Sequence, residues 1–173
     1  RVTISANRTK ENVVMQLRNF EKQDALILAD KMYGNLSVEQ IEDMIRQWNT
    51  KQYDGKYFDM FAVVTSDVIV GMLSLYKIKE KTLHIGPVIF PEFRKKGFAK
   101  AAMTLAFDVA KKMGFCTISQ QIRTDNVASI ALHRSLGFEI VGTPFVNAKG
   151  NEVCICEKHF SNALKKRVIF QKF

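Results

Sequence analysis

The chain has 173 residues, of which 47% are hydrophobic and 25% charged. This is the composition of an ordinary folded domain, and it excludes a disordered chain. No apolar run approaches the roughly 20 residues that a transmembrane helix requires, and no signal peptide is visible. We therefore expect one cytoplasmic domain over residues 1–173, with a short basic tail from about residue 160.

The formal net charge of +9 favours an anionic partner, either a nucleic acid or a phosphorylated small molecule. Lysines and arginines are spread along the chain, and the aromatic and basic signature of an RNA-binding sheet is missing. The sequence therefore disfavours nucleic acid as the partner and gives no reason to expect a membrane partner. It leaves a homodimer open.

Three cysteines, Cys116, Cys154 and Cys156, occur in the chain. An odd number without a pairing framework predicts free thiols in a reducing compartment. Cys154 and Cys156 would share one face of a strand, but zinc needs further ligands at suitable spacing, and no motif supplies them. We expect buried thiols and no metal.

The first elements in chain order are a strand and two helices. Alternating apolar residues predict the strand over 13–18. A helical period follows over 25–32. Ser37 and Gln40 have the spacing of a capping box and open a second helix that runs to Trp48.

The next elements are three strands, over 58–65, 68–77 and 82–90. Aromatic residues at strand spacing, Phe58 among them, are interpreted as core. Pro87 cannot donate a ladder hydrogen bond, so we expect a bulge or a splayed end near Gly86 and Pro87.

The remaining elements alternate between helices and strands. The pattern predicts a helix over 96–112, a strand over 116–122, a helix from Asn126 to Gly137, and strands over 139–145 and 152–159. The order is β, α, α, β, β, β, α, β, α, β, β. It predicts an α/β (α+β) domain with about seven strands and about four helices.

The turn that enters the third helix is the most informative stretch. It exposes unpaired N–H groups at the positive end of a helix dipole, where a phosphate binds well. Gly97 lets the backbone approach an anion, Ala99 keeps the first helical turn slim, and Arg94, Lys95 and Lys96 add positive charge. These residues predict a phosphate or pyrophosphate site; a capped helix beside a solvated basic loop is the alternative.

Two motifs resemble those of a known family. Arg94, Gly97 and Ala99 have the spacing of the coenzyme A pyrophosphate loop of the GNAT acetyltransferases, which is neither a Rossmann fingerprint nor a P-loop. The segment 126–138 is similar to the family's later motif, in which an Asn opens a helix and Gly-Phe closes it. Because both motifs occur in the right order, the chain is identified as a member of the GNAT family.

The resemblance implies the GNAT acyl-CoA N-acyltransferase fold, a mixed sheet splayed between its fourth and fifth strands with acetyl-CoA in the gap. Main-chain groups of Val88 and Phe90 would bind the pantetheine arm as an added strand does, and an amide near Val88 or Ile89 would stabilise the oxyanion. The other implied cofactor-binding residues are Arg94, Lys95, Lys96, Gly97, Phe98, Ala99, Asn126 and Ser129.

The resemblance also implies the catalytic residues. His133 stands where the family usually carries a Tyr that protonates the departing thiolate, and an imidazolium can donate a proton. His84 is the best candidate for a general base, with a hydrogen-bonded structural His as the alternative interpretation. Glu80, Glu139 or a water chain could replace it.

The expected reaction is direct transfer of the acetyl group to a primary amine of a small molecule or a protein N-terminus, without a metal. Tyr33 and Asn35 lie in a loop that lines the acceptor pocket in this family, although a turn with a packed ring explains them equally well. The sequence does not choose among acceptor amines. An acyl-CoA sensor without turnover is the competing hypothesis.

Overall fold

The computed structural model describes residues 4–8 and 13–160, so the predicted basic tail lies almost wholly outside the described residues. Within them the chain forms nine strands, four α-helices and two short 3-10 helices. The strands are β1 (Ile4–Arg8), β2 (Val13–Asn19), β3 (Gln52–Tyr53), β4 (Lys56–Thr65), β5 (Val68–Lys79), β6 (Thr82–Ile89), β7 (Thr117–Arg123), β8 (Glu139–Val146) and β9 (Glu152–His159). The α-helices are α1 (Ala25–Lys31), α2 (Val38–Trp48), α3 (Phe98–Lys112) and α4 (Val127–Ser135), and the 3-10 helices are Lys22–Asp24 and Pro91–Phe93.

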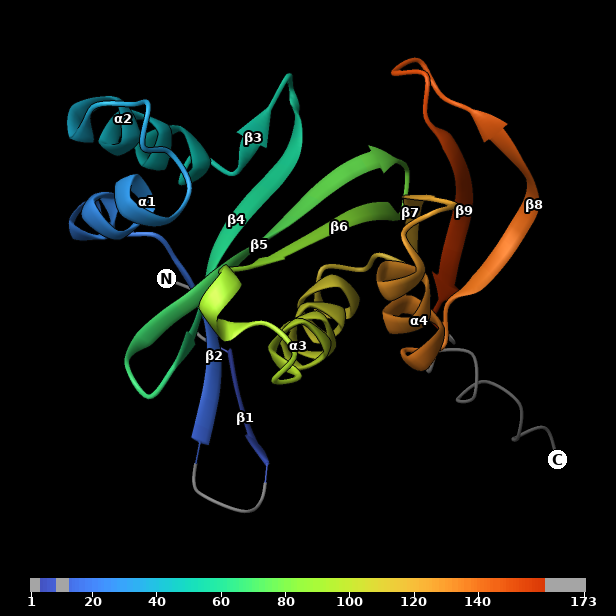
Figure 1. Cartoon of the computed structure of the whole chain (residues 1–173), viewed down its shortest axis with the longest axis horizontal. Coiled ribbons are helices and arrows are strands. Elements are labelled where there is room, and N and C mark those ends of the chain that lie inside the picture. Colours follow the sequence, from blue (N-terminus) through green and yellow to red (C-terminus); the bar gives the residue numbers. More distant parts are fainter. Residues whose placement is uncertain (1–3, 9–12, 161–173) are drawn as a thin grey trace, which may run out of the picture.

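The strands form one mixed sheet in the order β1-β2-β4-β5-β6-β7-β9-β8, with β3 paired to β4 (Figure 1). The β6–β7 pair is parallel, and the other pairs are antiparallel. The predicted order of elements is confirmed, but about seven strands was too few. β1 was missed because its apolar alternation is short, with Ile4 and Ala6 followed by polar and charged residues. β3 was missed because the two-residue strand lies in a polar stretch interpreted as a turn.

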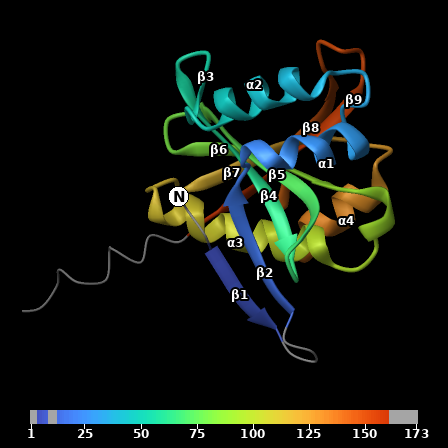
Figure 2. The same cartoon turned by 90° about the vertical axis from the view of Figure 1, so that its left-hand side faces the viewer.

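The sheet separates two hydrophobic clusters. Phe61 and Val63 of β4 belong to the cluster beneath α3, whereas Ala62 and Val64 belong to the cluster beneath α1 and α2. Figure 2 shows α1 and α2 on one side of the sheet and α3 on the other. Because successive side chains of a strand point to opposite faces, a central strand buried on both faces reads as a continuous apolar run.

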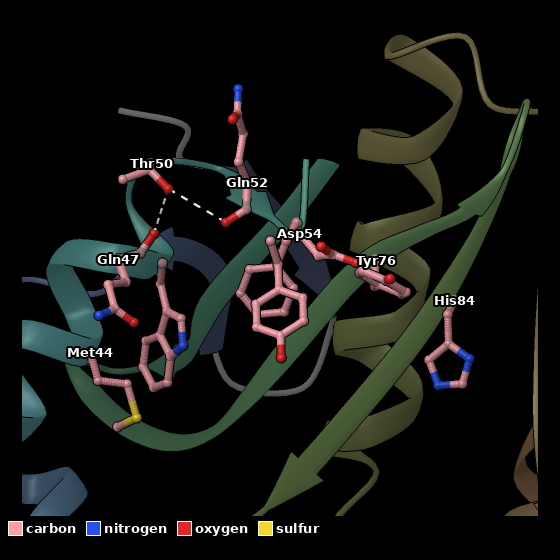
Figure 3. Close-up of a pocket in the computed structure, with 10 residues that line it drawn as sticks. Met44, Gln47, Thr50, Gln52, Asp54, Tyr76 and His84 are labelled. Atoms are coloured by element: carbon pink, nitrogen blue, oxygen red, sulfur yellow. Dashed lines mark hydrogen bonds between the residues drawn. The ribbon is translucent and has the colours of Figure 1, made fainter. Parts of the chain in front are cut away.

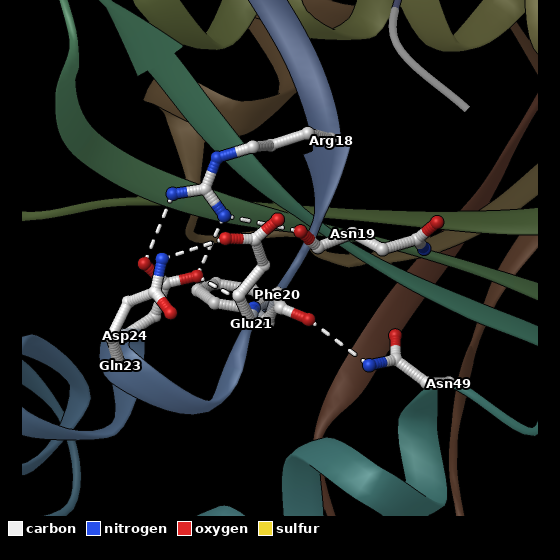
Figure 4. Close-up of polar contacts among 7 residues, drawn as sticks. All are labelled: Arg18, Asn19, Phe20, Glu21, Gln23, Asp24 and Asn49. Carbon is white, nitrogen blue, oxygen red and sulfur yellow. Dashed lines mark hydrogen bonds and ion pairs between the residues drawn. The ribbon is translucent and has the colours of Figure 1, made fainter. Parts of the chain in front are cut away.

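Polar contacts hold the helical layer of α1 and α2 against the end of β2 (Figure 4). The Arg18 guanidinium donates to both carboxylate oxygens of Asp24, at 2.6 and 3.0 Å. The Asn49 side chain, at the end of α2, donates to the Phe20 carbonyl at 3.0 Å. The predicted capping box of Ser37 and Gln40 is present. The Asn49 contact ties the end of α2 to the segment that follows β2.

The sheet opens between β6 and β7. The two strands pair only at Thr82 with Thr117 and at Leu83 with Ile118, while β6 stays paired to β5 as far as Ile89. Of the two predicted alternatives near Pro87, the splayed end is confirmed; the irregular register of β5 and β6 lies between Lys77 and Lys79 instead. Because Pro87 has no N–H, it cannot donate a hydrogen bond to a neighbouring strand.

Candidate active site

The turn between β6 and α3 is shaped by left-handed backbone. Lys95 has a φ of 61°, and Gly97, the N-cap of α3, has a φ of 83°. A Cβ placed on Gly97 would meet no atom within 4 Å, so glycine is favoured here by its conformation and not by crowding. The first N–H groups of a helix have no partner within it. The turn therefore presents main-chain donors and open space together.

A cavity of about 280 Å³ lies against this turn and is lined by residues of the turn, α3 and α4. Arg94, Lys95 and Lys100 line it, and so do Gly97 and Phe98. We call it the turn cavity. Its positive side chains and main-chain donors suit a phosphate or diphosphate.

Two of the basic side chains of the turn are held by neighbours. The Nε atom of Arg94 donates to the Ile89 carbonyl at 3.0 Å, which ties the turn to the end of β6. The Lys96 ammonium lies 5.5 Å from the centre of the Phe93 ring, and the described lining of the turn cavity does not include Lys96. The Lys96 side chain therefore packs against Phe93 outside the turn cavity.

A second cavity of about 520 Å³ occupies the space where β6 and β7 diverge. We call it the gap cavity. Residues of β6, β7, α3 and α4 line it, and Arg94 and Ala99 line the turn cavity as well, so the two are adjacent. Its lining residues are Gly86, Pro87, Val88, Ile89, Arg94, Ala99, Gln120, Asn126, Ala128, Ser129, Leu132 and His133.

The main chain of β6 alternates between its two neighbours. The Phe90 N–H donates to the Val70 carbonyl at 3.0 Å, and a Cβ added to Gly71 would lie 2.2 Å from the Val88 carbonyl oxygen. Val88 and Phe90 thus direct these groups toward β5, and the expectation that they bind the cofactor through the main chain is wrong. Because the main-chain groups of successive strand residues alternate in direction, the N–H and carbonyl groups of Ile89 point toward the gap. The sequence-based prediction was off by one residue because no pattern specified which neighbour each main-chain group faces.

Asn126 and Ser129 lie at the start of α4 and both line the gap cavity. The Asn126 side chain accepts a hydrogen bond from the Ser129 N–H at 3.1 Å, as an N-cap residue does. This contact places the first turn of α4 against the gap.

His133 is buried in α4, with 2% of its surface exposed. Its Nδ1 lies 2.8 Å from the Ser129 carbonyl, and because a carbonyl only accepts, Nδ1 carries the proton. Nε2 is buried and has no partner among the described residues. Burial lowers the pKa of His133, partly offset by the hydrogen bond to Ser129. The ring is therefore neutral near pH 7, with Nε2 as an acceptor, and not the proton-donating imidazolium expected from the sequence.

Leu83 and Ile85, the neighbours of His84 on β6, belong to the hydrophobic cluster beneath α3. Because successive side chains of a strand alternate, His84 points to the opposite face of the sheet. Burial, and secondarily the nearby His133, lowers its pKa, so the ring is unprotonated near neutral pH, as a general base requires. Glu80 and Glu139 are exposed, and the described linings of the three cavities do not include them. The structure favours His84 among the predicted bases.

A third cavity, of about 720 Å³, lies between α2 and the strands β3 to β6. We call it the aromatic cavity. In Figure 3, Met44 and Gln47 lie on one side of it and Tyr76 and His84 on the other. Its lining residues are Met44, Gln47, Trp48, Thr50, Gln52, Tyr53, Asp54, Phe58, Tyr76 and His84. Phe58 is thus a half-buried cavity residue, which corrects its interpretation as core.

The predicted acceptor residues lie elsewhere. Tyr33 packs against Trp48, with 6.5 Å between the ring centres, and Asn35 is exposed. The described lining of the aromatic cavity includes neither. Tyr53 and Tyr76, which do line it, were missed because only strand register shows that they share a face.

The two cysteines of β9 lie in the protein core. Cys154 and Cys156 are buried, and burial, with the neighbouring Cys154, raises the pKa of the Cys156 thiol to about 11. Over residues 4–8 and 13–160, no three His, Cys, Asp or Glu side chains are grouped closely enough to hold a metal ion. The helices within these ranges are also too short or too polar to cross a membrane.

Residues 14–139 match the family model described as the acetyltransferase (GNAT) domain. The chain belongs to the GNAT acetyltransferase family. The GNAT fold predicted from the two motifs is confirmed, and the enzyme is an acetyl-CoA-dependent N-acetyltransferase.

Two relatives have names that describe N-acetyltransferases. One is the SPbeta prophage-derived uncharacterized N-acetyltransferase YokL of Bacillus subtilis, 29% identical over 140 residues, covering 75% of this chain and 77% of that protein. The other is the [ribosomal protein bS18]-alanine N-acetyltransferase of Escherichia coli, 28% identical over 79 residues, covering 46% of this chain and 47% of that protein.

Solved structures share the fold. The RimL ribosomal L7/L12 α-N-protein acetyltransferase in complex with coenzyme A has a TM-score of 0.73 and 17% identity, over 84% of this chain and 93% of that one. The microcin C7 self-immunity acetyltransferase MccE in complex with acetyl-CoA and AMP has a TM-score of 0.69 and 18% identity, over 84% and 92%. These likenesses concern the fold alone.

Proposed function

We propose that this enzyme acetylates a primary amine, on a small molecule or a protein N-terminus, by direct attack on acetyl-CoA within a ternary complex. One observation carries the proposal: cavities lie on both sides of β6, where it has parted from β7. The gap cavity and the turn cavity would hold the cofactor, and the aromatic cavity would admit the amine. His84 lines the aromatic cavity, and His133 lines the gap cavity.

The cofactor would be held largely by the main chain. Amides of the first turn of α3 would bind the diphosphate, and the Ile89 carbonyl, which can accept a second hydrogen bond beside that from Arg94, would pair with the pantetheine arm as an added strand does. The buried Gln120 Oε1 and His133 Nε2 atoms have no partner among the described residues and belong to residues that line the gap cavity. Because both atoms accept hydrogen bonds, they suit the amide N–H groups of pantetheine.

The reaction forms an N–C bond and breaks the C–S bond of the thioester. The amine attacks the carbonyl carbon, the Ile89 N–H stabilises the oxyanion, and coenzyme A leaves as a thiolate. Pro87 has no N–H, so Ile89 is the suitable donor at this point of β6. The amine loses a proton to His84, directly or through water.

For a lysine-like acceptor a base matters more than an acid, whereas for an α-amine a base is optional. Deprotonating a lysine-like ammonium at pH 7 costs about 4.6 kcal/mol, and an α-amine costs about 1 kcal/mol. Releasing coenzyme A as a thiolate costs about 2 kcal/mol if its thiol resembles that of cysteine. A neutral His133 that donates no proton is therefore compatible with turnover.

The names of the relatives support a protein N-terminus as one class of acceptor. One relative is named for the alanine of ribosomal protein bS18, and a protein of like fold is named for ribosomal L7/L12. The cytoplasmic location, the single domain over 1–173 and a homodimer stay predictions.

The direct test is release of free thiol from acetyl-CoA in the presence of a panel of amines and short peptides. An enzyme releases thiol in proportion to acetylated product, whereas an acyl-CoA sensor would saturate with acetyl-CoA and release none. Nucleic-acid binding would instead weaken steeply with salt. Tight nucleic-acid binding without a thermal shift by acetyl-CoA would refute the proposal.

A further inference from the structure

The aromatic cavity has a distinctive wall. Phe58 pairs with Tyr76, and Tyr76 with His84, so the three rings form one row across β4, β5 and β6. Tyr53 adds a fourth ring, with its centre 6.1 Å from that of Phe58 and 6.3 Å from that of Tyr76. Trp48 lines the cavity from α2. Ring faces attract an ammonium group and also provide apolar area for a carbon skeleton.

The charge of the wall differs from that of the cofactor side. Among the described residues that line the aromatic cavity, Asp54 is the single carboxylate and none is a lysine or arginine. The turn cavity, by contrast, is lined by Arg94, Lys95 and Lys100. A polycation needs several carboxylates, and a phosphorylated amine needs cations. The wall suits a molecule with one ammonium group and an apolar body.

The size of the cavity fits such a molecule. A volume of about 720 Å³ falls within the range of pockets that bind small organic ligands. His84, at the end of the row of rings, lies on β6 two residues before Gly86, which lines the gap cavity where the thioester would lie. An amine bound against the rings would therefore present its nitrogen to a base.

We propose that the acceptor is a primary monoamine with an aromatic or otherwise apolar body, held by Trp48, Tyr53, Phe58 and Tyr76, with its amino group directed toward His84. This proposal rests on the proposed acetyltransferase function and specifies its substrate class. Polyamines, aminoglycosides and nucleotide-linked amines are the classes that the wall excludes.

Trp48 provides a binding test that does not depend on turnover, because it is the one tryptophan of the chain. Phenethylamine should change its fluorescence saturably, with an apparent Kd roughly tenfold below that of spermidine or kanamycin. Equal or tighter binding of spermidine or kanamycin would overturn the proposal, and so would the lack of a saturable change with phenethylamine.

A pair of variants tests the wall itself. Tyr76→Leu keeps the residue apolar but removes the ring, so the KM for phenethylamine should rise roughly threefold to tenfold, with an unchanged Kd for acetyl-CoA. Phe145→Leu is the matched control, because Phe145 lies on β8, is 42% exposed and is absent from the described linings of all three cavities. If both variants leave KM unchanged, the rings do not bind the acceptor.

The same assays separate this proposal from the underlying function. Thiol release with spermidine but not with phenethylamine overturns the substrate class and leaves the acetyltransferase function intact. If acetyl-CoA neither shifts the melting temperature nor releases thiol with any amine of the panel, the acetyltransferase function itself fails.

Discussion

The two sides of β6 are built in different ways. On the cofactor side, one continuous turn supplies the main-chain donors, the positive charge and the open space, and Arg94, Gly97 and Ala99 lie within it. On the acceptor side, the rings of Trp48 and Tyr76 come from elements far apart in the chain. Binding through the main chain depends on local conformation, whereas a wall of side chains depends on packing. The cofactor side should therefore respond most to a change of backbone or charge, and the acceptor side to the loss of individual side chains.

The largest effect is expected at the turn. Gly97→Glu places a carboxylate where we propose that the diphosphate binds and forces a side chain onto a φ of 83°, so the Kd for acetyl-CoA should rise about 1000-fold. Isothermal titration measures the change. Gly114→Glu is a matched control, because Gly114 has a φ of 82° and equally open surroundings. Comparable loss in both variants would show that strain, not the anion site, explains the effect.

The next effect should fall on the acceptor side. His84→Gln removes the proposed base, so kcat for an alkylamine should fall about 100-fold, with less loss for an amine of low pKa. Burial lowers the pKa of His84, and a base acts when unprotonated, so wild-type activity should rise with pH with a midpoint below the ordinary pKa of histidine. Steady-state pH profiles measure this rise. If the variant keeps the same profile, His84 is not the base.

The third prediction concerns the close approach of β5 to β6 at Gly71. In Gly71→Ala the new Cβ would lie 2.2 Å from the Val88 carbonyl oxygen, and because this atom belongs to the backbone, β5 and β6 must move apart. Unfolding free energy should fall by about 2 kcal/mol, measured by urea denaturation. Gly34→Ala is the control, since its Cβ would meet its nearest atom at 3.6 Å. If Gly71→Ala has the same unfolding free energy as the wild type, β5 and β6 can separate at this point without a loss of stability, and the prediction is wrong.

The smallest effect is expected at His133. His133→Phe removes one acceptor atom from the gap, so the KM for acetyl-CoA should rise about threefold while the pH–rate profile keeps its shape. If the pH–rate profile of the variant lacks a limb that the wild-type profile has, His133 does act as a proton donor.

The stability of the folded protein in acid should also depend on His133. Burial lowers its pKa in the folded protein, so the unfolded chain binds protons first as pH falls below about 6.5. Stability should decline from there until pH passes the lowered folded value. Thermal melts from pH 7 to pH 5 should show a shallower decline in His133→Phe.

The sequence alone predicted most of the fold and the conformation of the turn where we propose that the diphosphate binds. Periodicity, Ser37 and Gln40 as a cap, and Gly97 before a helix act over a few neighbouring residues, so they can be read from the chain. The splay near Pro87 was also predictable, because proline has no N–H to donate. β1 and β3 were not, because they depend on pairing with strands already in place.

Tertiary structure alone decided the chemistry of the side chains. Which main-chain groups of β6 face the gap follows from its pairing with β5, and a shift of one residue reverses the answer. His133 became a neutral acceptor because its burial and the Ser129 carbonyl fix its tautomer. The aromatic cavity arose because register aligns Phe58, Tyr76 and His84. Local patterns specify conformation, but burial and register depend on residues distant in the chain, so they exist only in the folded molecule.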